Sequence, residues 1–258
     1  MNIEPIHSKN GKTYWVETGD TLYAERLKHG QYQSRNWDFA QTLLHQFRTA
    51  IDIGSNNAVN AIHYAERFSH VECFEPTQLA QTLWHNTVRD NGVTNVTLHT
   101  QALGETHTTT EIILHERNGG HNHVAHYDKN PRARGTAKQK QTVDQRTLDS
   151  YNFSEVDYIK IDVEGYEYFV LQGGEATLAR ERPVLQLEIV ESQCRKFDYT
   201  PDEILDWLRA RDYRCVSKKR GWIDGAWSKG RGDMDLFFVP REWNTVLAPR
   251  LELFEENG

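Results

Sequence analysis

The segment 156–167 constrains the chain most, because it joins a strand pattern to a cluster of carboxylates at a glycine turn. Within it, apolar residues alternate with ionisable ones, and strand geometry puts Lys160, Asp162 and Glu164 on one face. Burying several charges beside an apolar face costs several kcal/mol for each ion unless the charges are paired or contact a ligand. The pattern therefore indicates the edge of an active site. The alternative is an ion pair between Lys160 and Asp162 at a strand end, with the glutamates in solvent.

A second strand pattern, over residues 50–53, breaks at Gly54 and runs into a helix pattern. A glycine at such a turn lets a ligand approach the backbone, and the free N–H groups of the first helical turn favour negative ligand atoms. The next strand pattern ends in Glu75. In a strand–helix–strand unit, an acidic side chain at this place can accept hydrogen bonds from both hydroxyls of a ribose.

The glycine pattern also bears on which cofactor the chain binds. A nicotinamide dinucleotide requires three glycines in the order G-x-G-x-x-G, because its pyrophosphate lies almost on the backbone, and only Gly54 is present. The segment reads D-x-G-x-N-x-A instead, with Asp52, Asn56 and Ala58 at the other positions. This pattern suits a ligand with an ammonium group and a ribose, and S-adenosylmethionine is such a ligand. We expect Asp52 to face its amino acid end.

Together these motifs resemble the FkbM-type methyltransferases, a family of class I S-adenosylmethionine-dependent enzymes. The resemblance covers about residues 12–240, and its K-I-D-V-E-G-x-E string is far more specific than a lone glycine motif. One departure is Ala58, where the family usually has a second glycine; the extra methyl group is expected near the methionine end of the cofactor and is acceptable if this position is already helical. The segments that carry the resemblance are 51–58, 72–76, 101–104, 144–149, 156–167 and 183–189, together with 30–32 and Trp37.

The resemblance implies a Rossmann-like α/β fold. Its seven-stranded, mostly parallel sheet has the order 3-2-1-4-5-7-6, with helices on both faces and an antiparallel last strand. We expect the residues Gly54, Asn56, Glu75 and Ala102, which lie on the matching motifs, to contact the cofactor.

Composition agrees with one enzyme domain, since 258 residues with 38% hydrophobic content can bury a core. We expect an N-terminal cap over residues 1–48, a methyltransferase domain over 49–240 and a C-terminal tail over 241–258. The formal net charge of −7 argues against general nucleic-acid binding. The three cysteines show no C-x-x-C spacing and no apolar run approaches the length of a membrane span, so we expect a soluble, cytoplasmic protein without a disulfide framework or a thiolate zinc site. The oligomeric state stays open.

The catalytic residues are expected at the switch point of the sheet, where open parallel sheets bind ligands beyond the carboxyl ends of their strands. Gly54, Glu75, Asp162 and Glu188 should converge there. A hydroxyl acceptor carries a proton that a base must remove, and Asp162 with Glu188 as its partner is the candidate base. Alternatively, Glu188 is only a strand-end carboxylate bonded to backbone. The N-P-P-Y and D-P-P-Y strings typical of N-methyltransferases are absent after the fourth strand, which favours O-methylation.

The carboxylates of Asp162 and Glu188 also suit a divalent cation that would lower the pKa of the acceptor hydroxyl. Carboxylates alone can act as the base, so a cation is an option and not a requirement. Lys160 and Glu164 are expected to contact the acceptor.

The acceptor side has further candidates. His123, in the histidine-rich segment 119–126, is a candidate base or ligand, although ordinary imidazoles in a polar loop are the simpler interpretation. Trp222 and Trp227 lie in a basic, aromatic loop. They could stack on a sugar ring as a lid, or pack against the cap helices. We expect a hydroxylated small molecule as the acceptor, with a carbohydrate as the leading candidate; the basic run 129–140 would suit an anionic one such as a nucleotide sugar.

Three classes of function remain. The leading one is a catalytic O-methyltransferase. The second is a binding or regulatory protein that keeps the fold without turnover, which Ala58 suggests and the intact Asp52, Glu75, Asp162 and Glu164 oppose. The third, a dinucleotide oxidoreductase, is disfavoured by the missing glycines. Calorimetry with S-adenosylmethionine and with NAD separates the third class from the first two.

Overall fold

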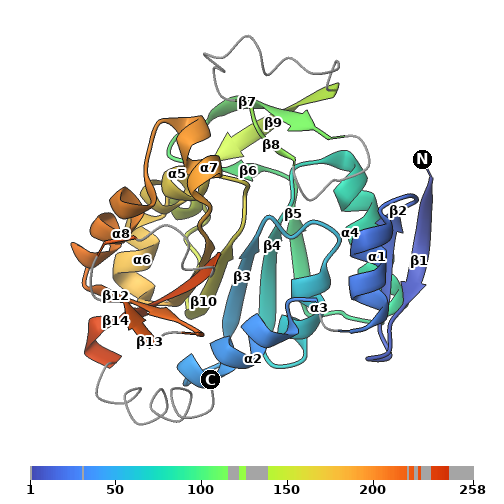
Figure 1. Cartoon of the computed structure of the whole chain (residues 1–258), viewed down its shortest axis with the longest axis horizontal. Helices are drawn as coiled ribbons and strands as arrows, with labels where there is room; N and C mark the ends of the chain where they lie inside the picture. Colours follow the sequence, from blue (N-terminus) through green and yellow to red (C-terminus); the bar gives the residue numbers. More distant parts are fainter. Residues whose placement is uncertain are drawn as a thin grey trace.

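An eight-stranded mixed sheet forms the centre of the part of the chain that the structure describes (Figure 1). The structure is a computed structural model, and it describes residues 2–30, 32–115, 122–125, 139–219, 221–223, 226–227 and 234–243. The strand order is β13-β12-β14-β11-β10-β3-β4-β5. The strands are β3 (Thr49–Ile53), β4 (His70–Phe74), β5 (Val96–His99), β10 (Val156–Ile161), β11 (Val184–Glu188), β12 (Tyr213–Ser217), β13 (Gly221–Ile223) and β14 (Asp235–Pro240).

The strands β5, β4, β3, β10 and β11 run parallel, so their carboxyl ends meet at one edge. The last strand, β14, is antiparallel to both β11 and β12. The predicted count of seven is wrong because β13 pairs with β12 as an eighth strand; with β13 set aside, the order is 3-2-1-4-5-7-6. β13 has only three residues, and so short a strand leaves no readable two-residue period in the sequence.

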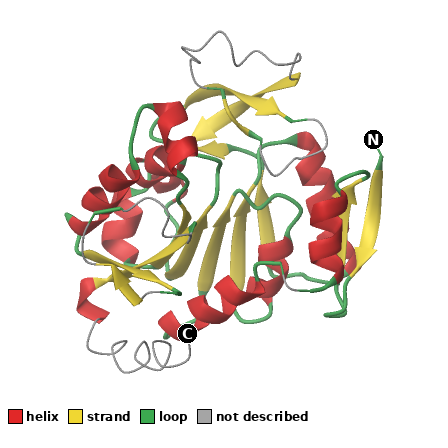
Figure 2. Ribbon diagram, in the orientation of Figure 1, coloured by secondary structure: helices red, strands yellow, loops and turns green. Residues whose placement is uncertain are grey.

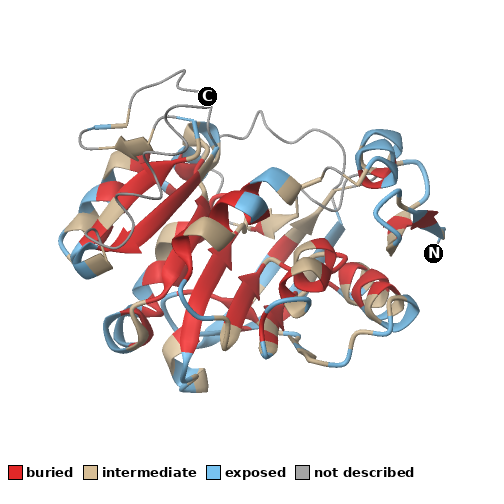
Figure 3. Cartoon of the chain, turned by 90° about the horizontal axis from the view of Figure 1, so that it is seen from below, coloured by how far each residue is buried: buried red, intermediate tan, exposed pale blue. Residues whose placement is uncertain are grey.

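Helices cover both faces of the sheet, and its central strands β3, β10 and β11 are almost fully buried (Figure 2, Figure 3). One hydrophobic cluster joins Ile51 and Ile53 of β3 to α5, α6 and α8, whereas Ala50 packs on the other face with α2, α3 and α4. The alternation along β3 thus serves two cores. The helices are α1 (Thr21–Lys28), α2 (Ser34–Leu43), α3 (Val59–Ala65), α4 (Gln78–Asp90), α5 (Glu167–Gln172), α6 (Glu175–Glu181), α7 (Glu191–Cys194) and α8 (Pro201–Arg209), with 3₁₀ turns at Leu148–Tyr151, Arg195–Phe197 and Arg241–Trp243.

A smaller sheet lies beyond the carboxyl edge of the main sheet, at the top of Figure 1. It has the order β6-β9-β7-β8 and is built from the long connection between β5 and β10. The observed strands are β6 (Ala102–Leu103), β7 (Thr108–Leu114), β8 (His123–Val124) and β9 (Gln139–Arg146).

The N-terminal segment adds a hairpin of β1 (Ile3–His7) and β2 (Thr13–Glu17) that packs beside α4. The backbone N–H of Trp15 donates to Oγ1 of Thr87 at 3.0 Å, which attaches the hairpin to that helix. Of the predicted tail, residues 244–258 lie outside the described part. Among the described residues, no helix combines the length and the apolar character that crossing a membrane requires.

Asp149, at the end of the segment 144–149, caps the start of α6 with its carboxylate. Its two carboxylate oxygens accept hydrogen bonds from the backbone N–H groups of Ala176 (3.0 Å) and Thr177 (2.7 Å), in the first turn of α6. These two N–H groups have no acceptor within the helix, so the carboxylate of Asp149 accepts their hydrogen bonds. Its negative charge also interacts favourably with the positive end of the helix dipole.

We expect Asp149→Ala to lower the free energy of unfolding by about 1–2 kcal/mol, the usual cost of losing a capping side chain. Chemical denaturation measures this. The matched control is Asp144→Ala on β9, whose side chain is 63% exposed, and which should change stability by less than about 0.5 kcal/mol. Equal effects of both substitutions would contradict the capping role.

Candidate active site

Gly54 brings the ends of β3 and β10 into direct backbone contact. Its φ of 82° lies in the left-handed region, and a Cβ atom on it would lie 1.9 Å from the carbonyl oxygen of Asp162. The N–H of Asp162 donates to the carbonyl oxygen of Ile53 at 3.0 Å. Glycine is therefore required both for the conformation and for the close approach of the two chains. The contact fixes Asp162 beside the turn that leads into α3.

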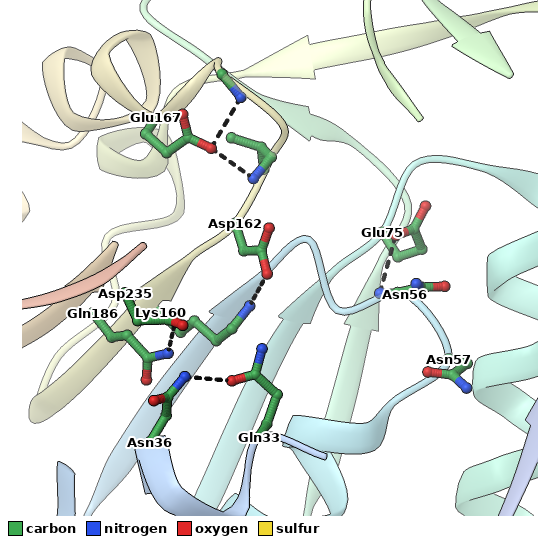
Figure 4. A network of polar contacts seen from close by, with 12 residues as sticks. Gln33, Asn36, Asn56, Asn57, Glu75, Lys160, Asp162, Glu167, Gln186 and Asp235 are labelled. Atoms are coloured by element: carbon green, nitrogen blue, oxygen red, sulfur yellow. Dashed lines mark hydrogen bonds and ion pairs between the residues drawn. The ribbon is translucent and has the colours of Figure 1, made fainter. Parts of the chain in front are cut away.

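The turn continues through two asparagines with different roles. The N–H of Asn56 donates to Oε2 of Glu75 at 3.1 Å (Figure 4). The buried Asn57 donates from Nδ2 to the carbonyl oxygen of Trp15 at 3.0 Å, and its Oδ1 accepts from the hydroxyl of Tyr23 at 2.7 Å. Asn57 thus attaches the N-terminal segment to the turn, while Asn56 joins the turn to β4.

Glu75 lies just beyond β4 and is held by its neighbours. Its Oε1 accepts from the N–H of Thr77 at 2.8 Å and from the hydroxyl of Thr77 at 2.6 Å, and its Oε2 accepts from Asn56. Burial raises the pKa of Glu75. A carboxylate offers about four lone-pair sites, so one site on Oε2 remains for a ligand. The carboxylate can accept one further hydrogen bond here, not the two that the sequence predicts.

Lys160 is a fully buried cation in β10, with 1% of its surface exposed. Its Nζ donates to Oδ2 of Asp162 at 2.9 Å (Figure 4). Burial alone would lower the pKa of Lys160, but the carboxylates of Asp162 and Asp52 outweigh it and raise the pKa above its usual value. The predicted ion pair therefore forms, and it forms at the end of the strand.

Asp52 lies opposite Lys160 in the parallel pairing of β3 and β10. It is completely buried, and neither of its carboxylate oxygens has a hydrogen-bond partner among the described residues. Burial raises its pKa, because desolvation disfavours the ionised form. The sequence predicts that Asp52 faces the cofactor. In the structure its side chain is buried on one face of the sheet and does not line the cavity described below.

Three carboxylates gather beyond the ends of β10 and β11. One oxygen each from Asp162, Glu164 and Glu188 lie within 4.8 Å of one another, and we refer to these residues as the acid trio. The negative charge of Asp162 is the main cause that raises the pKa of Glu188 to about 9, with burial as the next cause. The protonated form of Glu188 is therefore favoured over the ionised one. Close carboxylates cannot all stay ionised unless positive charge compensates them.

Glu167, the first residue of α5, holds the loop that carries the acid trio (Figure 4). Its Oε1 accepts from the N–H groups of Val163 (3.0 Å) and Gly165 (3.1 Å), and the hydroxyl of Tyr199 lies 3.3 Å from its Oε2. Glu164, which is expected to contact the acceptor, accepts from Nε2 of Gln193 and belongs to the trio.

A polar network lies beneath Lys160, between the sheet and α2 (Figure 4). The hydroxyl of Tyr158 donates to Gln186, whose Nε2 donates to Oδ1 of Asp235 at 2.7 Å. On α2, Nδ2 of Asn36 donates to Oε1 of Gln33 at 2.7 Å. Each buried polar group finds a partner here, which makes the network compatible with the core.

A cavity of about 460 Å³ opens at the carboxyl edge of the parallel strands. This volume lies in the range of sites for cofactors and small substrates, about 300–1,000 Å³. The cavity brings together most of the residues that the sequence predicts for the site, which are Gly54, Asn56, Glu75, Ala102, His123, Lys160, Asp162, Glu164 and Glu188.

The two predicted lid tryptophans lie outside this cavity. The guanidinium of Arg214 stacks over the ring of Trp222 at 4.0 Å, on β13 at the far edge of the sheet. The N–H of Trp227 donates to Oδ1 of Asp202 at 2.5 Å, so this residue is attached to the start of α8. The second interpretation, packing against the cap helices, fits Trp222, which packs on the cluster that includes Trp37 of α2, but not Trp227, which packs on the opposite cluster.

His123, on β8, lines the cavity, and its Nδ1 lies 3.4 Å from Nε2 of His115. The two other histidines of that segment, His121 and His126, lie outside the described residues, as does most of the basic run 129–140.

Ala58 is the N-cap residue of α3 and has a left-handed φ of 68°. The position is therefore not helical, although the sequence predicts that an alanine is acceptable there only if it is helical. This conformation costs an L-residue about 1–2 kcal/mol. The methyl group of Ala58 is fully buried in the core with Ala61 and Tyr64 and does not line the cavity. It therefore leaves the space for a ligand unchanged.

Several residues that line the cavity are not predicted from the sequence. They come from the N-terminal segment and from the residue before β14, and their only signal is the resemblance noted at Tyr32. Their positions depend on tertiary packing, such as the edge-to-face contact of Tyr23 and Tyr32 at 4.9 Å and the left-handed φ of 59° at Gln33. The residues are Asp20, Leu22, Tyr23, Arg26, Tyr32, Gln33 and Met234.

A family model described as the methyltransferase FkbM domain matches residues 52–215, which is more than half of the chain. The chain belongs to the FkbM methyltransferase family. The match begins at Asp52 and includes the glycine turn, Glu75 and all of the acid trio. It does not include the N-terminal wall of the cavity or Met234.

Comparison with solved structures finds several methyltransferases. The FkbM methyltransferase of Methylobacillus flagellatus KT is 16% identical with a TM-score of 0.47, over 86% of this chain and 56% of its own length. The ribosomal protein L11 methylase of Lactobacillus delbrueckii is 11% identical with a TM-score of 0.48, over 82% of this chain and 79% of its own. A Streptococcus mutans protein in complex with SAH is 8% identical with a TM-score of 0.46, over 79% of this chain and 94% of its own. No curated protein matches the chain.

The chain thus spans little more than half of the length of the Methylobacillus FkbM methyltransferase.

The buried carboxyl of Glu167 makes stability depend on pH. Burial raises its pKa from an ordinary 4.5 to about 7. The folded protein therefore holds this proton more tightly than the unfolded chain, and the stabilisation is complete below about pH 4.5 and lost as the pH rises through 7. The raised pKa of Glu188 also makes stability fall as the pH rises. The contribution of Glu167 is therefore measured as the difference between the wild type and a variant that lacks this carboxyl.

We expect Glu167→Gln to remove part of this dependence, because the amide oxygen still accepts the two backbone N–H groups but the side chain no longer titrates. Between pH 5 and pH 7.5, the unfolding free energy of the wild type should fall more than that of the variant, by on the order of 2 kcal/mol. Denaturation at both pH values measures the difference. Parallel pH curves for the two proteins would show that Glu167 has an ordinary pKa.

Proposed function

We propose that this FkbM-family chain is an S-adenosylmethionine-dependent methyltransferase that methylates a hydroxyl group of a small molecule. The observation that carries the proposal is the single cavity that joins the glycine turn, Glu75 and the acid trio. A ribose acceptor at one end and a cluster of proton acceptors at the other are the two things that such a reaction requires from the protein.

The donor set fits the cofactor. Glu75 keeps one free lone-pair site on Oε2, which suits a ribose hydroxyl, and the N–H that positions it comes from Asn56 in the glycine turn. Ala102 and Leu103 add an apolar wall at the same end of the cavity, which suits an adenine ring. S-adenosylmethionine, when bound, supplies a methyl group on a positively charged sulfur. The structure of the Streptococcus mutans protein contains the demethylated form of this cofactor.

The alternative function, a binding protein without turnover, loses the observation that favours it. It depends on Ala58 narrowing the cofactor site, and the methyl group of Ala58 packs into the core instead. The acid trio gives the cavity the groups that proton transfer requires, which a site for binding alone does not need.

Within the acid trio, the residues differ in their readiness to accept a proton. Glu188 is protonated at neutral pH, since its pKa is raised to about 9, whereas Asp162 is paired with the ammonium group of Lys160. We therefore assign the base to Asp162, which accepts the proton of the acceptor hydroxyl as the oxygen attacks the methyl carbon. Glu188, in its neutral form, can donate a hydrogen bond that orients the hydroxyl. Holding the hydroxyl in line supplies most of the remaining rate enhancement.

The proposal does not include a divalent cation. Three carboxylates within 4.8 Å are a possible set of oxygen ligands, but Lys160 already places a positive charge 2.9 Å from Asp162, and an ammonium group so close repels a metal ion. The cavity offers charge compensation without a metal. Activity that survives thorough chelation supports this point, and activity restored only by added Mg²⁺ or Mn²⁺ refutes it.

The first prediction concerns the cofactor. Glu75→Ala should weaken S-adenosylmethionine binding by about 2 kcal/mol, the loss expected for a hydrogen bond to a charged group. Titration calorimetry measures this, with SAH as the second ligand, because both share the ribose and should lose the same amount. The control is Glu111→Ala, an exposed glutamate paired with Lys140 outside the cavity, which should leave both affinities unchanged. If Glu75→Ala binds both ligands normally, the ribose site lies elsewhere.

The second prediction separates Asp162 from Glu188. Asp162→Asn keeps the size but removes the base, so kcat should fall by about two to four powers of ten, as for the loss of a positioned proton acceptor. Glu188→Gln resembles the neutral form that prevails at neutral pH and should lower kcat by less than about tenfold. Thermal unfolding of each variant checks that the fold persists, since Lys160 loses its partner in Asp162→Asn.

The measurement is turnover of labelled S-adenosylmethionine with an acceptor found by screening hydroxylated compounds. A reversed order, with Glu188→Gln much slower than Asp162→Asn, would assign the base to Glu188. Normal turnover by both variants would move the base to another residue of the cavity, and His123 is the candidate that the sequence predicts.

A further inference from the structure

The rim of the cavity carries exposed aliphatic side chains. In the described part of the chain, Leu22 and Met234 are the large hydrophobic residues that stand out as exposed, with 78% and 56% of their surface in solvent. Both line the cavity, although they come from opposite ends of the chain. Single exposed apolar residues are common, but here they coincide at one opening, and apolar surface gathered at a site marks a contact.

Met234 lies next to the acid trio. Its carbonyl oxygen accepts from the N–H of Ile189 at 2.7 Å, and the next residue, Asp235, pairs with Glu188 across β11 and β14. A molecule whose hydroxyl group reaches the acid trio therefore lies close to Met234, which lines the same cavity. The side chain of methionine is flexible and adapts to apolar partners of different shape.

Leu22, in the first turn of α1, lines the same cavity. Beside it, the rings of Tyr23 and Tyr32 meet edge to face at 4.9 Å and also line the cavity. The hydroxyl of Tyr23 is already bonded to Asn57 at 2.7 Å, so its ring is the part that remains for a ligand. This segment therefore adds apolar surface next to Leu22.

We infer that the acceptor carries an apolar group close to the hydroxyl that is methylated, and that this group packs between Leu22 and Met234. The inference rests on the proposed function and narrows its acceptor from hydroxylated small molecules to amphipathic ones. Binding then removes two exposed aliphatic side chains from water, which is a favourable change.

The two exposed side chains suit an aliphatic group better than a sugar ring. Proteins hold sugar rings largely by stacking them on flat aromatic faces, and leucine and methionine present no flat face. An alkyl chain or another aliphatic body matches their exposure better.

The test uses the full chain saturated with SAH, which fills the cofactor side without turnover. The probes are methyl, butyl, hexyl and octyl β-D-glucoside, each below its micelle concentration, and binding is measured by calorimetry. If an alkyl group packs on the rim, Kd should fall by roughly two- to fourfold for each added methylene. The sugar is constant along the series, so the slope reports the apolar contact alone.

The double variant Leu22→Asn, Met234→Gln keeps side-chain size and removes the apolar surface. It should abolish most of the slope while Kd for SAH stays within about twofold of the wild-type value. Ile3→Asn, which makes the same kind of change on β1 outside the cavity, should keep the slope. Both variants are checked by thermal unfolding.

A flat series in the wild type, or the same slope in the wild type and the double variant, would overturn the inference and leave the proposed function standing. Failure of SAH and S-adenosylmethionine to bind the wild type would overturn the proposed function, and this inference with it.

Discussion

The close contact between Gly54 and the carbonyl oxygen of Asp162 determines the geometry of the site. Because a Cβ atom at Gly54 would approach this oxygen to 1.9 Å, the turn after β3 and the end of β10 pack backbone against backbone. The turn leads to Asn56 and through it to Glu75, and β10 leads to the acid trio. One contact therefore sets the distance between the two halves of the cavity, and it involves no side chain that could reorient.

The charges of β10 are tolerated because they are arranged around one buried cation. Lys160 neutralises Asp162 directly, and its charge also compensates Asp52 in the neighbouring strand. The raised pKa of Glu188 disfavours a further negative charge there. Of the two interpretations of segment 156–167, the ion pair between Lys160 and Asp162 forms and lines the cavity. The glutamates of that interpretation do not lie in solvent, because Glu164 and Glu167 are buried. The edge of an active site stays a prediction. Burial of such a pair is costly unless its remaining polar atoms are satisfied.

Sequence patterns predict the strands that end in charged residues and the acidic residues that line the cavity. They succeed for Glu75 and Asp162 because a period of two and a glycine turn are local properties. They place Asp52 wrongly with respect to the cavity, because this residue, two positions before Gly54, still belongs to β3 and is buried on one face of the sheet. The tryptophans mislead for a related reason: their chemistry suits a sugar, but where Trp222 lies depends on the pairing of β13 with β12.

Residues inside and outside the family domain together form the cavity. The residues matched by the family model supply the glycine turn, Glu75 and the acid trio, whereas the segment 20–33 and Met234 supply another part of the lining. Asn57 joins the two, since its Oδ1 accepts from the hydroxyl of Tyr23. Among the described residues, the side chains of Glu75 and Lys160 bond to Asn56, Thr77 and Asp162, none of which belongs to segment 20–33. Under the proposed function, the acceptor contacts of this segment and of Met234 can therefore change while these bonds stay in place.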